Sequence, residues 1–307
     1  MTSETVWKIP EPLSTCETRL DDDTVTTLRR HGNPAGPRLV LSHGNGLAID
    51  LYYPFWSLLA DDFDLIIYDL RNHGWNTVGN RKNHNLPTLV RDRHCILESI
   101  DYHYGNKPKI GVFHSLSALI ALMSSSMPTT LSSSSQREGF SAQILFDPPV
   151  HKPGTSQTEF DVAAERAAKM TRRRGDRFQT EEDFTELLSY LPAFTRFVPG
   201  ALELMASTTL RKSANGQEYE LRCPREYEAQ VIGYIRSYSM LADVEILPCP
   251  TKIIGADPTL PYSYLPTSDF SHVISVDYDF LPETTHFLQL EKPAECVAEI
   301  RKFLGEL

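Results

Sequence analysis

Short apolar runs alternate with amphipathic segments along most of the chain, and this alternation restricts the possible folds more than any other feature. Each run has five or six residues, is rich in Val, Ile or Leu, and is bounded by Gly, Pro or Asp. Such runs are typical of strands that are buried on both faces of a parallel sheet. The runs lie at residues 38–42, 64–69, 109–113, 143–147, 251–255 and 272–276.

Helical patterns lie between the apolar runs. Residues 87–103 place Leu89, Ile96 and Ile100 at helical spacing, and residues 293–304 carry a second apolar face. Strands that alternate with helices indicate an α/β fold, in which right-handed crossovers join mostly parallel strands.

The alternation stops between residues 151 and 245, where helix-like segments follow one another. The length of 307 residues is compatible with one large domain or two smaller ones. We interpret residues 1–150 and 246–307 as one α/β core in two sequence pieces, and residues 151–245 as a mostly helical insertion.

Charge and cysteine content limit the kinds of binding partner and indicate the cellular compartment. Forty acidic and 30 basic residues give a formal net charge of -10, which disfavours binding to nucleic acid or to an anionic membrane. The five cysteines form no C-x-x-C pair and read as reduced thiols. No apolar run approaches the roughly 18 residues of a membrane span, and the N-terminus lacks the features of a secretion signal. We therefore expect a cytoplasmic protein without a membrane span; nothing in the sequence predicts its oligomeric state.

The segment at residues 111–119 carries the strongest chemical signal. An apolar strand ends at His114 and residues 117–123 begin a buried helix, so Ser115 lies on the sharp turn between them. A serine in this position projects its Oγ above the sheet edge, next to the N–H groups of a helix N-terminus. Those donors would stabilise developing negative charge, as a nucleophile requires. A helix N-cap serine is the alternative interpretation.

Two neighbours of Ser115 depart from the usual pattern. Small residues are wanted two positions before and after the serine, because strand and helix approach closely there. Ser117 is small, but Phe113 is bulky. We expect Phe113 to require either a slight separation of the strand and helix or a relaxed turn.

Four segments, in this order, resemble the α/β hydrolase superfamily of serine hydrolases. They are LVLSHGNG at residues 39–46, YDLRNHG at 68–74, VFHSLSALIAL at 112–122 and TTHFLQLEKP at 284–293. The resemblance covers roughly residues 36–150 and 245–305. It implies a mostly parallel sheet of roughly eight strands flanked by helices, with residues 151–245 as an inserted helical cap.

The resemblance implies a catalytic triad of serine, acid and histidine. Ser115 matches the nucleophile and His286 the general base, although a surface histidine is the alternative for His286. For the acid we favour Asp257, which follows the strand before the one that leads to His286. Its spacing from Gly255 is one residue shorter than usual. Asp147, at the end of an earlier strand, is the alternative acid, or simply a loop-capping aspartate.

The same resemblance implies an oxyanion hole built from the backbone N–H groups of Leu116 and Asn45. By the same resemblance, His43 is expected to brace the loop at residues 43–46, and a structural role is expected for His73. No cofactor and no metal are implied.

The predicted activity is that of a serine hydrolase. Its substrate would be a small hydrophobic carboxylic ester, thioester or lactone, cleaved through an acyl-enzyme on Ser115. A C–C bond hydrolase or an acyltransferase would use the same triad. The alternative from another class is a non-catalytic ligand-binding protein with this fold.

Overall fold

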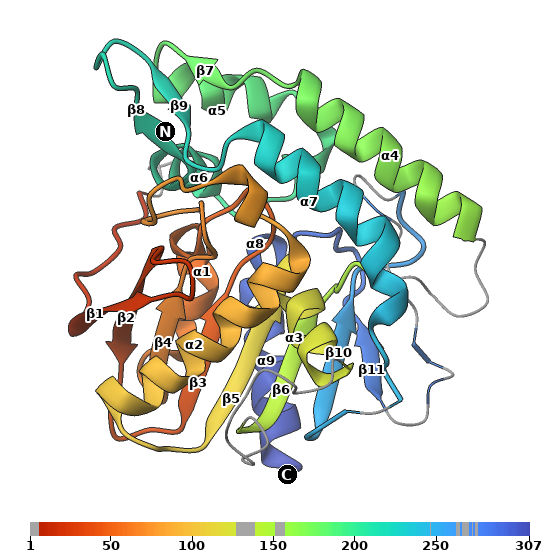
Figure 1. Cartoon of the computed structure of the whole chain (residues 1–307). Coiled ribbons are helices and arrows are strands. Elements are labelled where there is room, and N and C mark those ends of the chain that lie inside the picture. The colour runs from red at the N-terminus through yellow and green to blue at the C-terminus, as the bar shows by residue number, and fades with distance from the viewer. Residues whose placement is uncertain are drawn as a thin grey trace.

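Eight strands form one sheet in the order β1-β2-β4-β3-β5-β6-β10-β11, as the computed structural model shows (Figure 1). The structure describes residues 6–126, 139–150, 157–245, 247–261, 265, 270–271, 273 and 276–307. The strands from β4 to β11 are parallel, whereas β1 and β2 are antiparallel at one edge. The fold predicted from the sequence is confirmed. The strands are β1 (Ser14–Arg19), β2 (Val25–Gly32), β3 (Arg38–Ser42), β4 (Asp64–Tyr68), β5 (Lys109–His114), β6 (Phe140–Phe146), β10 (Thr251–Gly255) and β11 (Asp277–Phe280).

Five of the six predicted strands coincide with β3, β4, β5, β6 and β10. The sixth, at residues 272–276, lies partly outside the described residues, and the described strand β11 begins directly after it. Strands β1 and β2 were not predicted. β1 is an edge strand with mostly exposed side chains, whereas β2 lies between β1 and β4 and carries several buried or half-buried polar side chains, so neither forms an apolar run.

Helices cover both faces of the sheet. Figure 1 shows α2 and α3 in front of the strands and α8 and α9 behind them. Strand β3 illustrates the two faces, because Val40 packs with α2 and α3 whereas Leu39 and Leu41 pack with α1 and α9. The predicted helices 87–103 and 293–304 correspond to α2 and α9. The core helices are α1 (Tyr53–Trp56), α2 (Leu86–Tyr104), α3 (Leu116–Ser126), α8 (Leu288–Glu291) and α9 (Pro293–Gly305).

The segment between β6 and β10 runs along one end of the sheet, at the top of Figure 1. Its helices are α4 (Gln157–Arg173), α5 (Glu181–Ser189), α6 (Ala201–Thr209) and α7 (Arg225–Tyr238). It also contains a small antiparallel sheet that was not predicted, formed by β7 (Arg177–Phe178), β8 (Leu210–Lys212) and β9 (Tyr219–Leu221). These strands have two or three residues, which is too short for an alternating pattern to be read.

Short 3₁₀ helices complete the described chain at Ile49–Tyr52, Ser57–Leu59, Arg81–Asn83, Pro192–Phe194 and Ser239–Leu241. Within the described ranges, none of the helices combines the length and the apolar character that are needed to cross a membrane.

The direction of the parallel strands fixes where polar side chains can gather. The carboxyl ends of β3, β5 and β6 meet at one end of the sheet and lead directly into the loops that carry His43, Ser115 and Asp147. At the opposite end, where the parallel strands begin, Asp64 accepts hydrogen bonds from Arg30 at 2.6 Å and from Arg38 at 3.0 Å. In α/β sheets, ligands bind at the carboxyl ends of the strands.

Candidate active site

Ser115 lies between the last residue of β5 and the first residue of α3. Its φ of 52° is in the left-handed region, which is uncommon for a residue with a Cβ and marks a strained turn. The Ser115 N–H donates to the carbonyl of Phe146 at 2.9 Å, which fixes the turn against the neighbouring strand β6. The sharp turn predicted at this residue is therefore present.

Gly111 explains how the bulky Phe113 is accommodated. The two residues lie on the same face of β5, and a Cβ added to Gly111 would lie only 2.5 Å from the Phe113 ring. The ring thus fills the space over the glycine and packs edge-on against Phe140, at 5.7 Å between ring centres. The compensation that we expected in the turn is found within the strand.

Ser117 does more than supply a small volume. Its Oγ accepts a hydrogen bond from the His114 N–H at 3.0 Å and donates one to the His114 carbonyl at 2.9 Å. The Ser117 side chain therefore closes the turn around Ser115. From the sequence, Ser117 is expected only to be small enough for this position.

His286 joins the serine to a carboxylate. Its Nε2 lies 2.8 Å from Ser115 Oγ, and its Nδ1 lies 2.6 Å from Asp147 Oδ2. Both pairs are largely buried, with Ser115 6% and Asp147 4% exposed. Three side chains from the ends of different elements thus form one continuous hydrogen-bonded chain.

The carboxylate next to His286 is that of Asp147. Asp257, the acid favoured from the sequence, does not lie there. Asp257 accepts hydrogen bonds from the N–H and hydroxyl of Thr259 at 2.8 and 2.6 Å, and from the Glu283 N–H at 2.7 Å. These bonds, led by the Thr259 hydroxyl, lower the pKa of Asp257. The Asp257 carboxylate is thus held by its own turn and by the Glu283 main chain, and not by His286.

Asp147 reaches His286 because its strand is closer to the serine. Strand β6 lies beside β5, whereas β10, which precedes Asp257, is one strand further away. Asp147 also has a positive φ, of 39°, and its N–H donates to the Ile254 carbonyl at 2.8 Å. This backbone arrangement holds the residue between the ends of two strands.

The segment that carries His286 is fixed by Glu291 of α8. The Glu291 carboxylate accepts a hydrogen bond from the Thr285 N–H at 2.6 Å and another from the Thr285 hydroxyl. Burial raises the pKa of Glu291, while the bonds from Thr285 oppose that rise. The residue before His286 is thereby tied to the helix that follows it.

Two main-chain segments approach Ser115. Leu116 is the first residue of α3, so its N–H has no acceptor within the helix. On the other side, a Cβ added to Gly44 would lie 3.2 Å from the Cβ of Ser115, so the loop after β3 passes directly beside the serine. Asn45 is the next residue of that loop, and its Nδ2 donates to the Glu228 carbonyl of α7 at 2.9 Å.

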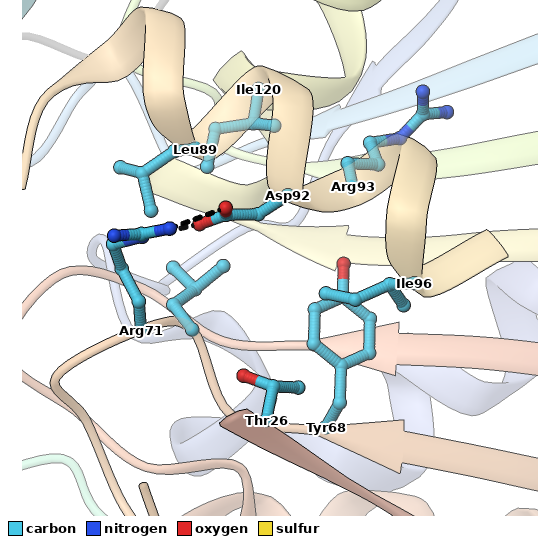
Figure 2. A pocket seen from close by; sticks show the side chains of 9 residues that line it. Thr26, Tyr68, Arg71, Leu89, Asp92, Arg93, Ile96 and Ile120 are labelled. Carbon is cyan, nitrogen blue, oxygen red and sulfur yellow. Dashed lines mark hydrogen bonds and ion pairs between the residues drawn. The ribbon is translucent and has the colours of Figure 1, made fainter. Parts of the chain in front are cut away.

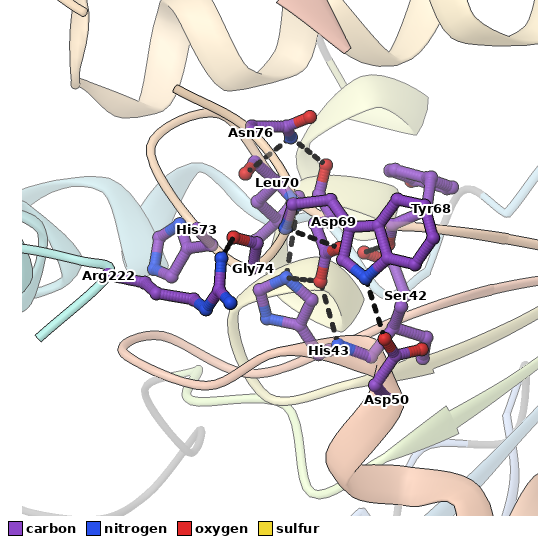
Figure 3. A network of polar contacts seen from close by, with 12 residues as sticks. Ser42, His43, Asp50, Tyr68, Asp69, Leu70, His73, Gly74, Asn76 and Arg222 are labelled. Carbon is purple, nitrogen blue, oxygen red and sulfur yellow. Dashed lines mark hydrogen bonds and ion pairs between the residues drawn. The ribbon is translucent and has the colours of Figure 1, made fainter. Parts of the chain in front are cut away.

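Buried neutral histidines support the same loop (Figure 3). His43 Nδ1 donates to the Gly44 carbonyl at 2.7 Å, and its Nε2 accepts from the Leu70 N–H at 3.0 Å. Burial lowers the pKa of His43 to about 4. Gly46 N–H donates to His73 Nε2 at 3.0 Å, and burial lowers the pKa of His73 to about 3. Both rings thus contact the loop after β3; this contact was predicted for His43, whereas only a structural role was predicted for His73.

Figure 2 shows a separate small cavity between α2 and strands β2 and β4. Its volume is about 10 Å³, room for about one water molecule. The cavity is bordered by an ion pair in which Asp92 accepts two hydrogen bonds from Arg71. We assign it no ligand. Across the described part of the chain, no three or more His, Cys, Asp or Glu residues form a group that could hold a metal ion.

Comparison with known proteins identifies the family of the chain. The profile of a family described as "Alpha/beta hydrolase family" matches residues 39–299. No curated protein sequence matches the chain.

Solved structures share the fold at low sequence identity. E-2-(acetamidomethylene)succinate hydrolase has a TM-score of 0.75 at 14% identity, over 95% of this chain and 99% of that one. The thioesterase domain from the curacin biosynthetic pathway has a TM-score of 0.68 at 15% identity, over 94% and 99%. An esterase from Thermogutta terrifontis has a TM-score of 0.64 at 16% identity, over 95% and 98%.

Proposed function

This chain belongs to the alpha/beta hydrolase family, and we propose that it is a serine hydrolase whose nucleophile is Ser115. The substrate would be a small hydrophobic carboxylic ester, thioester or lactone, cleaved through an acyl-enzyme. One observation carries the proposal: Ser115 Oγ, the His286 ring and the Asp147 carboxylate form a chain with contacts of 2.8 and 2.6 Å.

In the first half of the reaction, His286 Nε2 removes the hydroxyl proton of Ser115 as Oγ attacks the substrate carbonyl carbon. The tetrahedral intermediate collapses when the bond to the alcohol or thiol breaks, and His286 returns the proton to this leaving group. In the second half, water attacks the acyl-enzyme in the same way. The acid is released and Ser115 regains its proton.

Asp147 has the role that we had favoured for Asp257. Its carboxylate accepts a hydrogen bond from Nδ1–H of His286, which leaves Nε2 free to act as the base. It also stabilises the imidazolium that forms in each half of the reaction. The Leu116 and Asn45 N–H groups would donate to the oxyanion, because they flank Ser115 from the helix start and from the loop after β3.

We assign substrate selection to the segment 151–245, as a cap over the site. Its helix α7 contacts the loop beside Ser115 through the hydrogen bond from Asn45 to Glu228. A thioesterase and an esterase share this fold, so both types of bond belong in a substrate panel.

A fluorophosphonate probe tests the nucleophile directly. Attack by Oγ on phosphorus releases fluoride and leaves a stable adduct, which peptide mass spectrometry can locate. We expect labelling at Ser115 and none in Ser115→Ala. The control Ser124→Ala removes another buried α3 serine, whose Oγ donates to the Ile120 carbonyl of its own helix, and should label normally.

The alternatives predict other results. A folded wild-type protein that fails to react would overturn the hydrolase proposal and favour a ligand-binding protein. Labelling at Ser115 without release of acid from p-nitrophenyl esters, thioesters or lactones would favour C–C bond hydrolysis. Diversion of the acyl group to an added alcohol or amine would favour acyl transfer.

A further inference from the structure

His114, the residue directly before Ser115, connects three separate parts of the site. Its Nε2 lies 2.7 Å from the main-chain carbonyl oxygen of His286, and its Nδ1 lies 2.6 Å from the hydroxyl of Tyr52. That hydroxyl in turn accepts a hydrogen bond from the Gly44 N–H at 3.2 Å. We propose that His114 and Tyr52 are positioning residues, which hold the His286 main chain and the Gly44 loop in place around Ser115.

The proton positions in this chain of bonds follow from its two ends. A carbonyl oxygen can only accept, so His114 Nε2 must carry a proton and donate it to His286. The Gly44 N–H can only donate, so the Tyr52 hydroxyl proton points to His114 Nδ1. His114 is therefore neutral with its proton on Nε2, and all four polar groups are satisfied.

Burial keeps the arrangement in this protonation state. His114 and Tyr52 are each 1% exposed. Burial, with a smaller contribution from the nearby His286, holds the pKa of His114 well below its usual value. Burial likewise raises the pKa of Tyr52. A neutral His114 matters here because its ring centre lies 4.8 Å from that of His286, and a second positive charge would oppose the imidazolium of the proposed reaction.

The His286 main chain needs such a contact because no regular structure holds it. Residues 281–287, which are all described, lie between β11 and α8 and form neither strand nor helix. On the amino-terminal side of His286, Glu291 holds Thr285 by a hydrogen bond. On the carboxyl-terminal side, His114 holds the main-chain carbonyl of His286 itself. The His286 side chain can bridge Ser115 and Asp147 only while its backbone stays in this place. Displacement of a reacting group by about 1 Å can lower a rate about 100-fold.

Three variants distinguish the effect of losing the hydrogen bonds of His114 and Tyr52 from the effect of changing side-chain volume. His114→Leu removes both hydrogen bonds, whereas His114→Gln can place an amide N–H where Nε2 donates to His286. Tyr52→Phe removes one hydroxyl and keeps the ring. The control His31→Leu removes another buried histidine, which lies on β2 and packs against Trp56 of α1 with 5.0 Å between ring centres.

Two measurements are made on each full-length folded variant. The first is the second-order rate of fluorophosphonate labelling, together with kcat and KM for an ester that wild type cleaves. The second is the downfield proton NMR signal of His286 Nδ1–H, which reports the bond to Asp147 without any turnover. Melting temperatures show the stability loss that both Leu variants share.

We expect His114→Leu to slow labelling and kcat about 10- to 100-fold at a similar KM, and to broaden or lose the NMR signal. His114→Gln should recover most of the rate and the signal, Tyr52→Phe should be intermediate, and His31→Leu should match wild type. The positioning role is overturned if His114→Leu keeps the signal and a rate within about 2-fold of wild type. It is also overturned if His114→Gln is as impaired as His114→Leu.

The inference rests on the proposed function, but the two can fail separately. If wild type does not label at Ser115, the hydrolase proposal fails. The NMR comparison would still decide whether His114 positions His286. If His114→Leu does not fold, the Tyr52→Phe and His114→Gln results decide: a wild-type signal and rate in Tyr52→Phe together with loss of both in His114→Gln would overturn the proposal.

Discussion

The Asp147 carboxylate lies 2.6 Å from Nδ1 of His286, although the two residues are 139 positions apart in the sequence. Asp147 directly follows β6, which is adjacent to the strand that leads to Ser115, so the proposed acid and nucleophile lie after neighbouring strands. The site is thus assembled by the order of strands in the sheet, which brings together residues from three loops.

Asparagine substitutions at the two candidate acids should give opposite results. Asp147→Asn removes the acceptor that fixes the tautomer of His286, so we expect kcat to fall by about 10⁴. Asp257→Asn should leave kcat close to wild type, because the Asp257 carboxylate accepts hydrogen bonds from Thr259 and the Glu283 N–H, whereas His286 Nδ1 is bonded to Asp147. Steady-state kinetics on one ester measures both. The opposite ranking would return the acid role to Asp257.

The sequence predicted the parallel core because strands such as β3 and β10 are buried at every position and leave an unbroken apolar run. It also located Ser115 and His286, since each lies in a short segment with a recognisable local pattern. The choice between Asp147 and Asp257 could not be made in this way. The choice of acid depends on which strand lies next to β5 and on the direction in which a turn points its carboxylate. Local residue patterns determine neither.

The contacts that support the site were equally hidden. Tyr52 and His114 are 62 residues apart, and Asn45 and Glu228 are 183 residues apart. Only Ser117 left a usable signal, because a serine two residues after the nucleophile can bond the backbone of the same turn. Residue patterns therefore identify the reacting groups more readily than the groups that hold them.

The contact between Gly111 and Phe113 predicts a coupled pair of substitutions. Gly111→Ala places a Cβ 2.5 Å from the Phe113 ring and should destabilise the fold by about 1–3 kcal/mol through overpacking. Adding Phe113→Leu makes room for the new methyl group, so the double variant should recover part of that loss. Urea unfolding of both single variants and the double variant measures the coupling. Additive effects would show that Phe113 is accommodated in some other way.

The buried histidines predict a loss of stability in mild acid. The pKa of His43 is about 4 and that of His73 about 3, whereas an unfolded histidine has a pKa of about 6.5. Between these values the unfolded chain binds more protons than the folded one. The contribution of these neutral histidines to the free energy of unfolding is therefore complete above about pH 6.5 and is lost as the pH falls towards 4.

Urea midpoints at pH 7.5, 6 and 5 measure this dependence. His31→Gln should reduce its slope, because burial also lowers the pKa of His31 to about 4. His103→Gln, at an exposed position of α2, serves as the control and should keep the slope of wild type. A flat profile for wild type between pH 7.5 and 5 would contradict the proposed linkage.

The hydrogen bond from Asn45 to Glu228 predicts that helix α7 helps to hold the proposed oxyanion loop. Asn45→Ala keeps the backbone N–H but removes the tether of 2.9 Å to α7, so we expect kcat to fall about 10-fold at a similar KM. That is less than the 100-fold or larger loss, in order of magnitude, for an oxyanion donor removed outright. Asn45→Asp should be worse, because a carboxylate would face the Glu228 carbonyl oxygen.

Asn33→Ala is the matched control for this tether. The Asn33 side chain also makes two hydrogen bonds, one with the Ala35 N–H and one with the Asp61 carbonyl, but Asn33 lies in the turn between β2 and β3, at the end of the sheet opposite to Ser115. The Asn33→Ala variant should therefore have a lower melting temperature but the same kcat as wild type. Kinetics and melting temperatures of the three variants distinguish the outcomes. Equal kcat values for Asn45→Ala and wild type would mean that the Gly44 and Gly46 contacts hold the loop without α7.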